Sequence, residues 1–373
     1  MSAAPRRHHA VFHPLSVRAV ERVTEDAVAL TFDVPDELRE SYRFTHGQHL
    51  TLRTTIDGQD VRRNYSICSP ATSGALRVAV KRLEGGVFSA YALDGLKPGD
   101  TLDVMTPTGH FSTPLDPGQA KHYVAVAAGS GITPVFSIVA TALEVEPRST
   151  VTLVYGNRTT KSVMFLDELA DLKNRYPDRL ELLHVLSREP VDVDLFAGRI
   201  DAEKTASLLE TLVPPEDVDE WFVCGPFGMV TDVQKALAES GVDPDHVHVE
   251  LFHVEEEPPR PRSRPEGAGV EDGAGAAGGG PVSTVTVYLD GRASTFPLER
   301  DAGSVLDAAL AVRSDAPYAC KGGVCGTCRA RLVEGEVSMD RNFALERDEV
   351  EQGFRLACQS HPVTDRVALD FDA

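Results

Sequence analysis

The chain has 373 residues, a formal net charge of −20 and 42% hydrophobic residues, so we expect a folded protein of two or three domains. The acidic balance argues against nucleic-acid binding, which needs a basic surface. No apolar stretch reaches the roughly 18 residues of a membrane helix and the first residues lack a signal-peptide core, so we expect a cytoplasmic protein.

Short segments separated by turn residues occupy the first part of the chain. AVALTFDV, HLTLRTTI and LRVAVKRL have the character of strands, and DGQD and KPGD are turn signals between strands. Many short strands with regular turns are typical of an antiparallel barrel. The sequence therefore predicts a β-barrel domain at 8–116.

The pattern changes near residue 117. Continuous apolar runs such as YVAVAAG, VTLVYGN and EWFVCGP alternate with stretches of helical periodicity. Such strands are buried on both faces, and with intervening helices they indicate a parallel sheet that binds ligands at the carboxyl ends of its strands. We expect an α/β domain at 117–254.

A linker and a third domain are predicted after this sheet. Residues 255–282 are rich in Pro, Gly, Ala and charge and almost lack large apolar residues, as is typical of a flexible linker; an ordered surface loop is the alternative. Within the third domain, 283–373, VSTVTVYLDGRASTFPL predicts a hairpin and SVLDAALAV a helix.

Three cysteines lie in one short loop, CKGGVCGTC, and a fourth follows much later. Cys320, Cys325, Cys328 and Cys358 give the pattern C-x4-C-x2-C…C, which is the plant-type spacing for a 2Fe–2S cluster. The glycines between them let backbone amides approach the sulfur atoms. A zinc ribbon is the alternative, although structural zinc sites usually pair two C-x2-C motifs.

Two motifs in the barrel region suit a flat, phosphorylated cofactor. Arg63, Tyr65 and Ser66 come at the end of a predicted strand, and Gly86 and Ser89 at the start of a predicted helix. A guanidinium, an aromatic ring and a helix N-terminus could serve a phosphate, a ring system and a pyrophosphate. A purely structural role is the alternative for each motif taken separately.

A glycine loop follows the first predicted strand of the parallel sheet. In GSGITP, Gly129 and Gly131 precede a helix for which Thr133 is a candidate cap, and Pro134 suits the first turn. The loop presents free amides to a dinucleotide phosphate, but it lacks the third glycine of G-x-G-x-x-G.

Taken in order, these motifs resemble the ferredoxin–NADP reductase superfamily fused to a plant-type ferredoxin. The likeness covers nearly the whole chain, through R-x-Y-S, G-G-x-x-S, G-S-G-I-T-P, Y-G-N-R, C-G-P and H-x-E-x-F. More narrowly, YRFTHGQHLTL, PYACKGGVCGTC and the final DFDA look like the reductase subunits of phenylacetyl-CoA epoxidases. The resemblance implies a flavin-binding barrel, an NAD(P)-binding α/β domain and an α+β ferredoxin domain of the β-grasp type.

The resemblance also implies roles for single residues. Arg63 would hold the flavin pyrophosphate, Tyr65 would stack on the isoalloxazine, and Ser66 would hydrogen-bond near flavin N5. Gly86 and Ser89 would cradle the phosphates. With Tyr65 and Ser66, Cys224 would stand at the reacting centre. The implied nucleotide site and flavin edge comprise Gly129, Gly131, Thr133, Pro134, Arg158, Ser187, Arg188, Cys224, Gly225, Pro226 and Phe252. For Cys224 and Phe252, plain core packing is the alternative.

The implied function is electron transfer from NADPH through FAD and a 2Fe–2S cluster to the di-iron oxygenase subunits that epoxidise phenylacetyl-CoA. A hydride donor and a one-electron cluster need a cofactor such as flavin between them. In this family a ribose 2′-phosphate would lie near Ser187 and Arg188, with Arg158 close by, so we expect NADPH over NADH. A solvated surface arginine is the alternative for Arg158 and for Arg188. The alternatives are the reductase of another ring-hydroxylating oxygenase, and a redox-sensing or electron-storage module without significant turnover.

Carboxylates of the third domain are expected to form an acidic docking surface for the oxygenase, with strength that falls as salt rises. They are Glu334, Glu336, Asp348, Glu349 and Glu351. Plain solvated surface is the alternative.

Overall fold

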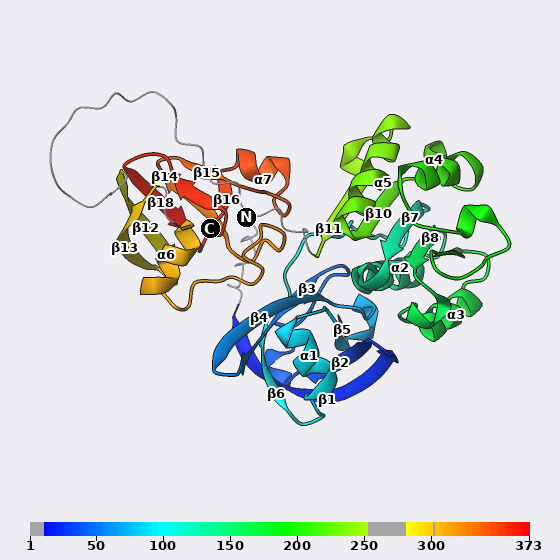
Figure 1. Ribbon diagram of the computed structural model, residues 1–373, viewed down its shortest axis with the longest axis horizontal. Helices are drawn as coiled ribbons and strands as arrows, with labels where there is room; N and C mark the ends of the chain where they lie inside the picture. Colours follow the sequence, from blue (N-terminus) through cyan, green and yellow to red (C-terminus); the bar gives the residue numbers. More distant parts are fainter. Residues whose placement is uncertain (1–10, 253–280, 301–302) are drawn as a thin grey trace. The chain divides into compact units, whose positions relative to one another are not determined.

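The computed structural model describes residues 11–252, 281–300 and 303–373. The chain divides into two compact units, Met1–Phe252 and His253–Ala373, and each is described by itself (Figure 1). The predicted linker 255–282 lies outside the described residues except for its last two positions, and the first strand of the second unit already begins at Val282. In the described ranges, no helix is both long and apolar enough to span a membrane.

Six antiparallel strands form the first sheet of unit one, in the order β4-β3-β6-β1-β2-β5. A bridge between Ile67 and Val78 joins the end of β4 to β5 and closes the sheet, which confirms the predicted barrel. Helix α1 packs against β2, β3, β4 and β5 and buries Phe88 in the barrel core. The bounds are β1 Phe12–Thr24, β2 Ala27–Asp33, β3 His49–Ile56, β4 Gln59–Ser66, β5 Leu76–Lys81, α1 Val87–Asp94 and β6 Thr101–Met105.

A five-stranded parallel sheet follows, in the order β11-β10-β7-β8-β9. The chain runs from β7 to β8 and β9 on one side, then crosses to β10 and β11 on the other. The carboxyl ends of β7 and β10 therefore flank the point where the strand order reverses, which is where such sheets bind ligands. The bounds are β7 His122–Ala128, α2 Ile132–Val145, β8 Thr150–Asn157, α3 Leu166–Arg175, β9 Leu180–Leu186, α4 Ala202–Thr211, β10 Glu220–Gly225, α5 Phe227–Glu239 and β11 Val247–Leu251.

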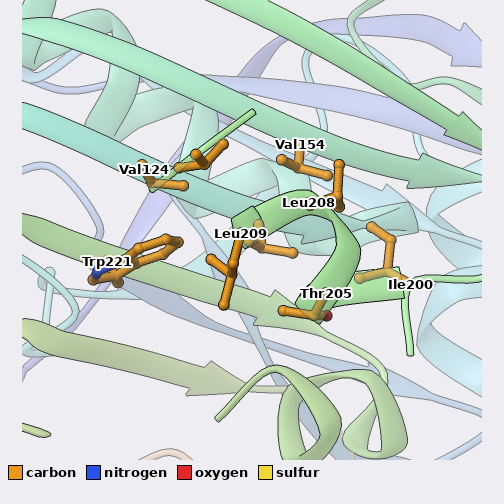
Figure 2. Close-up of a pocket in the computed structure, with 9 residues that line it drawn as sticks. Val124, Val154, Ile200, Thr205, Leu208, Leu209 and Trp221 are labelled. Carbon is orange, nitrogen blue, oxygen red and sulfur yellow. The ribbon is translucent and has the colours of Figure 1, made fainter. Parts of the chain in front are cut away.

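Both faces of the parallel sheet are covered, as its apolar strands predict. Tyr123 and Ala125 of β7 belong to the core around α2, whereas Val124 and Val126 face α4, because successive strand residues point to opposite faces. Figure 2 shows α4 side chains beside Trp221 of β10, around an apolar cavity of about 10 Å³. A cavity this small and apolar is a packing gap without room for a ligand.

Helix α2 joins the barrel to the parallel sheet. The Ser137 hydroxyl donates to the Ser69 carbonyl at 2.7 Å, and the Ala71 amide donates to the Thr141 hydroxyl at 3.0 Å. Ala27 of β2 is buried in the same apolar cluster as α2. Barrel and sheet therefore share one core, which fixes the end of β4 relative to the carboxyl ends of the parallel strands.

The second unit is a mixed sheet, in the order β13-β12-β18-β14-β16, with a separate β15–β17 pair. The expected hairpin forms around Asp290 and Gly291, whose positive φ angles of 53° and 67° suit a tight two-residue turn. The Ser304 hydroxyl accepts from the Asp307 amide and caps α6. The bounds are β12 Val282–Leu289, β13 Arg292–Glu299, α6 Val305–Val312, β14 Arg329–Glu334, β15 Val337–Met339, α7 Arg347–Glu351, β16 Phe354–Leu356, β17 Ser360–Pro362 and β18 Arg366–Asp370.

Candidate flavin, nucleotide and iron–sulfur sites

The end of β4 presents the three residues predicted to meet a flavin. Arg63 is exposed. In the part of the chain that the structure describes, its guanidinium donates one hydrogen bond, to the neighbouring Arg62 carbonyl at 2.7 Å. The Tyr65 ring lies 5.4 Å from the Phe88 ring of α1, centroid to centroid, and burial raises the pKa of its phenol. A cation and a fixed aromatic ring at one strand end fit a phosphorylated, flat cofactor.

The turn before α1 is shaped by Gly86 and Ser89. A side chain at Gly86 would place its Cβ 2.7 Å from the Ser89 oxygen and 3.0 Å from the Leu83 Cβ, so only glycine fits without a shift. The Ser89 hydroxyl accepts from the Leu83 amide at 3.1 Å and donates to the Gly86 carbonyl at 3.0 Å. Ser89 thus holds the turn that ends at the helix N-terminus, and its direct contact with a phosphate stays a prediction.

Ser66 is tied to a carboxylate that the predicted site residues did not include. Its hydroxyl donates to Glu250 Oε2 at 3.0 Å, across from β4 to β11. Burial raises the pKa of Glu250 to about 8. The nearest imidazole, His49, lies 4.0 Å away, and burial lowers its pKa to about 4, so it is neutral and does not offset the carboxylate charge.

Glu250 also pairs with the predicted Cys224, since the two residues are opposite each other in β10 and β11. Burial raises the pKa of the Cys224 thiol well above its usual range, with a further contribution from Glu250. Phe252 follows two residues after Glu250 and is partly exposed. The H-x-E-x-F pattern was the sequence signal that could have identified Glu250.

The glycine loop after β7 packs against the end of β10. A Cβ at Gly131 would lie 2.1 Å from the Cys224 carbonyl oxygen, so no side chain fits there. Gly129 has a φ of 55°, and its carbonyl accepts from the Tyr155 hydroxyl at 2.9 Å. Tyr155, another residue missing from the predicted site, therefore holds the loop in place.

Thr133 corrects one expectation. Helix α2 begins at Ile132, so Thr133 lies inside its first turn, and its hydroxyl donates to the Ser130 carbonyl at 3.0 Å instead of capping the helix. Pro134 occupies the first turn as expected, where an amide is dispensable. The Thr133 side chain is buried, so its methyl and hydroxyl stabilise the turn.

Gly225 and Pro226 follow one another at the end of β10, beside the reversal of strand order. A Cβ at Gly225 would lie 2.5 Å from the Met229 side chain and 3.3 Å from the Ala128 amide. Pro226 is the residue before α5. The ends of β7 and β10 thus approach each other closely through glycines.

Three arginines gather at the ends of β8 and β9. The Arg188 amide donates to the Arg158 carbonyl at 2.8 Å, and the Ser187 amide to the Asn157 carbonyl at 2.9 Å, so the two segments run side by side. Arg158 and Arg188 are exposed, and neither guanidinium forms an ion pair with a described residue. Exposed Arg199 lies near them, because the Gly198 amide donates to the Leu186 carbonyl.

The four motif cysteines are brought together by strand pairing. Cys328 precedes β14 and Cys358 follows β16, and these strands pair with Arg329 opposite Leu356. The Ala357 amide donates to the Cys328 carbonyl at 3.0 Å. The β14–β16 pair therefore carries the distant fourth cysteine back to the loop.

The sulfur atoms are arranged in two pairs. The neighbouring Cys325 thiol lowers the pKa of Cys320 to about 6, and the neighbouring Cys328 thiol lowers the pKa of Cys358. Among the described residues, no group of three or more His, Cys, Asp or Glu is placed to hold a single metal ion. Four neighbouring thiols in the C-x4-C-x2-C…C spacing fit a 2Fe–2S cluster, whereas a structural zinc site usually pairs two C-x2-C motifs and this sequence has one.

The carboxylates expected to form an acidic surface are partly used within the unit. Glu349 pairs with Arg329, and both side chains are largely buried. Glu351 pairs with Arg347 at 3.0 Å and Glu334 with Arg366 at 3.5 Å. Three of the five carboxylates are therefore paired within the unit, and the docking role of the group stays a prediction.

Comparison with known proteins finds three domain families along the chain, in the predicted order. The oxidoreductase FAD-binding domain matches residues 14–113, the oxidoreductase NAD-binding domain matches 125–235, and the 2Fe-2S iron-sulfur cluster binding domain matches 287–363. The exposed cation and ring on β4, the glycines at the ends of β7 and β10, and the four cysteines fall within these three regions.

Relatives are similar over nearly the whole chain. One subunit of 1,2-phenylacetyl-CoA epoxidase from Escherichia coli (strain K12) is 46% identical, over 97% of this chain and 98% of that protein. The ferredoxin reductase component of 3-ketosteroid-9-alpha-monooxygenase from Rhodococcus rhodochrous is 37% identical, over 96% of both. The structure of phthalate dioxygenase reductase matches with a TM-score of 0.57 at 24% identity, over 96% of this chain and 98% of that one, which supports the fold.

These matches identify an oxidoreductase with FAD-binding, NAD-binding and 2Fe–2S domains. The chain therefore belongs to the family of oxygenase reductases that includes this component of the 1,2-phenylacetyl-CoA epoxidase.

Proposed function

We propose that the chain transfers electrons from NADPH to the di-iron oxygenase subunits of a phenylacetyl-CoA epoxidase. The identity of 46% to one component of the Escherichia coli epoxidase, over almost the full length of both proteins, carries this assignment. When bound, FAD takes up a hydride and releases its electrons singly, and a 2Fe–2S cluster accepts one electron at a time. We also propose a cytoplasmic location, where thiol ligands stay reduced.

The residues at the end of β4 would bind and orient the flavin. Arg63 supplies an exposed positive charge for a phosphate, and Tyr65 supplies a ring held by Phe88. Ser66 is fixed in direction by its bond to Glu250. Because the pKa of Glu250 is about 8, its carboxyl is mostly protonated at neutral pH, which avoids a buried negative charge beside the ring.

The glycines at the ends of β7 and β10 would lie beside the nicotinamide. Gly131 and Gly225 lack the side chains that would fill the space between the strand ends. Cys224 is in β10, which lies between β7 and β11, and it is opposite the buried Glu250 of β11. These residues would shape the place where the nicotinamide meets the flavin, and their roles rest on this geometry and on the family resemblance.

Two exposed arginines support NADPH over NADH. Arg158 and Arg188 stand on segments joined by a backbone hydrogen bond, so their guanidinium groups can reach a common dianion such as a ribose 2′-phosphate. Glu189 is the nearby opposing charge, but both of its oxygens accept from Thr160. NADH offers no phosphate at this position and gains nothing from the pair.

Reconstitution tests the proposal. The purified chain, loaded with FAD and iron–sulfur cluster, is combined with the oxygenase subunits of phenylacetyl-CoA epoxidase, NADPH, O₂ and phenylacetyl-CoA. We expect substrate-dependent NADPH oxidation and epoxide formation that require this chain. The same oxygenase with its own reductase shows that the preparation is competent.

Two outcomes would contradict the assignment. Absence of product with a competent oxygenase would refute the proposed oxygenase partner. Productive electron transfer to a 3-ketosteroid monooxygenase would instead assign the chain to that kind of oxygenase, since the reductase component of that enzyme is also similar over nearly the whole chain. A redox-sensing or storage module would not sustain NADPH oxidation with ferricyanide, so that assay separates the second class of function.

A further inference from the structure

A buried glutamine lies directly against the fourth cysteine. Gln359 is 8% exposed, and its side-chain nitrogen Nε2 lies 3.5 Å from the Cys358 sulfur, within the range of an N–H···S hydrogen bond. The same nitrogen is within hydrogen-bond distance of the Lys321 carbonyl, at 2.9 Å, and of the Cys358 carbonyl, at 3.1 Å, so its two hydrogens are shared among three acceptors. One amide group therefore links the fourth cysteine to the loop that carries the other three.

The backbone holds Gln359 from both sides. Its amide donates to the Leu356 carbonyl at 2.9 Å, and its carbonyl accepts from the Asp340 amide at 3.0 Å. These bonds anchor it between β16 and the β15–β17 pair. They fix the backbone from which the Gln359 side chain reaches the Lys321 carbonyl.

The cysteine loop is shaped to receive this side chain. Lys321 has a positive φ of 54°, which turns the backbone at the loop. Its carbonyl oxygen is the acceptor that lies nearest to Gln359 Nε2, at 2.9 Å. At Gly323 an added Cβ would lie 3.1 Å from Gln359 Cγ and 3.2 Å from the Arg341 carbonyl. The glycine thus leaves the volume that the glutamine occupies.

Cys320 and Cys358, the first and last cysteines of the motif, receive different kinds of hydrogen-bond donor. Cys320 accepts from the Gly322 backbone amide at 3.3 Å, and any residue at that position except proline could supply such a donor. The Gly323 backbone amide also acts on Cys358 and lowers its pKa, but Cys358 receives in addition a side-chain donor, the amide of Gln359. An N–H donor stabilises a thiolate more when the iron beside it is reduced and the sulfur is more negative, and burial strengthens the effect.

We propose that Gln359 is a positioning residue that raises the reduction potential of the cluster through its bond to Cys358 and fixes the spacing between that cysteine and the loop. The proposal rests on the proposed 2Fe–2S site and deepens it. It adds a residue outside the four ligands that sets how readily the second unit accepts an electron.

The substitution Gln359→Met keeps the length and bulk of the side chain and removes both N–H donors. A neutral hydrogen bond contributes on the order of 0.5–1.5 kcal/mol, so we expect a change of about two- to tenfold in the one-electron reduction equilibrium, or a midpoint more negative by up to about 60 mV at 59 mV per tenfold. Gln359→Glu adds a carboxylate and should move the midpoint further in the same direction.

Spectroelectrochemical titration of the full chain, followed by visible absorption and electron paramagnetic resonance, measures the shift. The matched control is Ser360→Ala, because Ser360 is also buried but its hydroxyl donates to the Leu356 carbonyl at 2.8 Å and forms no hydrogen bond to a cysteine among those described. That control should leave the midpoint unchanged.

The outcomes separate this inference from the function on which it rests. A wild-type chain that binds no 2Fe–2S cluster overturns the cluster assignment itself. If the wild-type chain holds its cluster, the variants decide the role of Gln359. A midpoint potential and spectrum of Gln359→Met or Gln359→Glu equal to those of Ser360→Ala would overturn that role. The electron-transfer function would still stand.

Discussion

The substitution Arg188→Ala removes one of the two guanidinium groups proposed to hold the 2′-phosphate of NADPH. The structure isolates this change well, because the Arg188 side chain is exposed and makes no ion pair with a described residue. Its backbone bond to Arg158 does not depend on the side chain. The variant should therefore fold normally and lose only a ligand contact.

The magnitude follows from the exposure of the site. A hydrogen bond to a charged group contributes about 1.5–3 kcal/mol, and solvent screening at an exposed site reduces this to about 1–2 kcal/mol. At 1.36 kcal/mol per tenfold, we expect kcat/KM for NADPH to fall about five- to thirtyfold. The value for NADH should stay within about twofold, because NADH has no charge for Arg188 to meet.

Steady-state reduction of ferricyanide with each nucleotide measures the effect without requiring the cluster. Arg175→Ala is a matched control, since Arg175 is an exposed arginine of the same domain that pairs with Glu144 at 3.6 Å. The NADPH preference should also weaken as ionic strength rises. Equal losses with both nucleotides, or no loss with either, would show that Arg188 does not read the 2′-phosphate.

Three further substitutions test the other sites. Cys358→Ser should destabilise or remove the visible iron–sulfur absorption and stop reduction of one-electron protein acceptors while NADPH-to-ferricyanide activity persists; a fully retained cluster would refute the ligand assignment. Gly131→Ala forces a Cβ to 2.1 Å from the Cys224 carbonyl oxygen. It should therefore lower the free energy of unfolding by about 1–3 kcal/mol and raise KM for NADPH and NADH alike. Unchanged kinetics with both nucleotides would contradict the packing of this loop. The Glu250 pKa is raised from 4.5 to about 8 in the folded chain, so its stabilising contribution is complete below about pH 4.5 and is lost as the pH rises through about 8. Glu250→Gln, which cannot ionise, should therefore gain thermal stability relative to wild type across this range, whereas a pH-independent difference would argue against a buried titrating carboxyl.

Much of the fold was predictable because apolar periodicity directly reflects burial. The continuous Val and Ala runs of β7 and β8 predict strands covered on both faces, and alternate residues of β7 indeed face α2 and α4. The hairpin at Asp290 and Gly291 follows from turn chemistry. In each case the signal is local, so one stretch of sequence contains all of it.

The site was less predictable where contacts join distant segments. Glu250 meets Ser66 across 184 positions of the chain, and no local pattern reports that meeting. Thr133 was a reasonable cap by composition, but the preceding 3₁₀ turn, Gly129–Gly131, starts the helical backbone early and moves Thr133 into the helix. The sequence supplies the residue types, and tertiary packing decides which atoms they meet.

The carboxylates of the second unit show why side-chain charge is the hardest property to predict. Glu349 lies in a capping box at the start of α7, and its carboxylate meets Arg329, which follows Cys328 at the start of β14. The ion pair thus connects α7 to the strand that carries a cluster cysteine, so its role here is structural. A carboxylate counted as docking surface from sequence is instead part of the support of the metal site, and the unit can recognise a basic partner only through charges that remain unpaired.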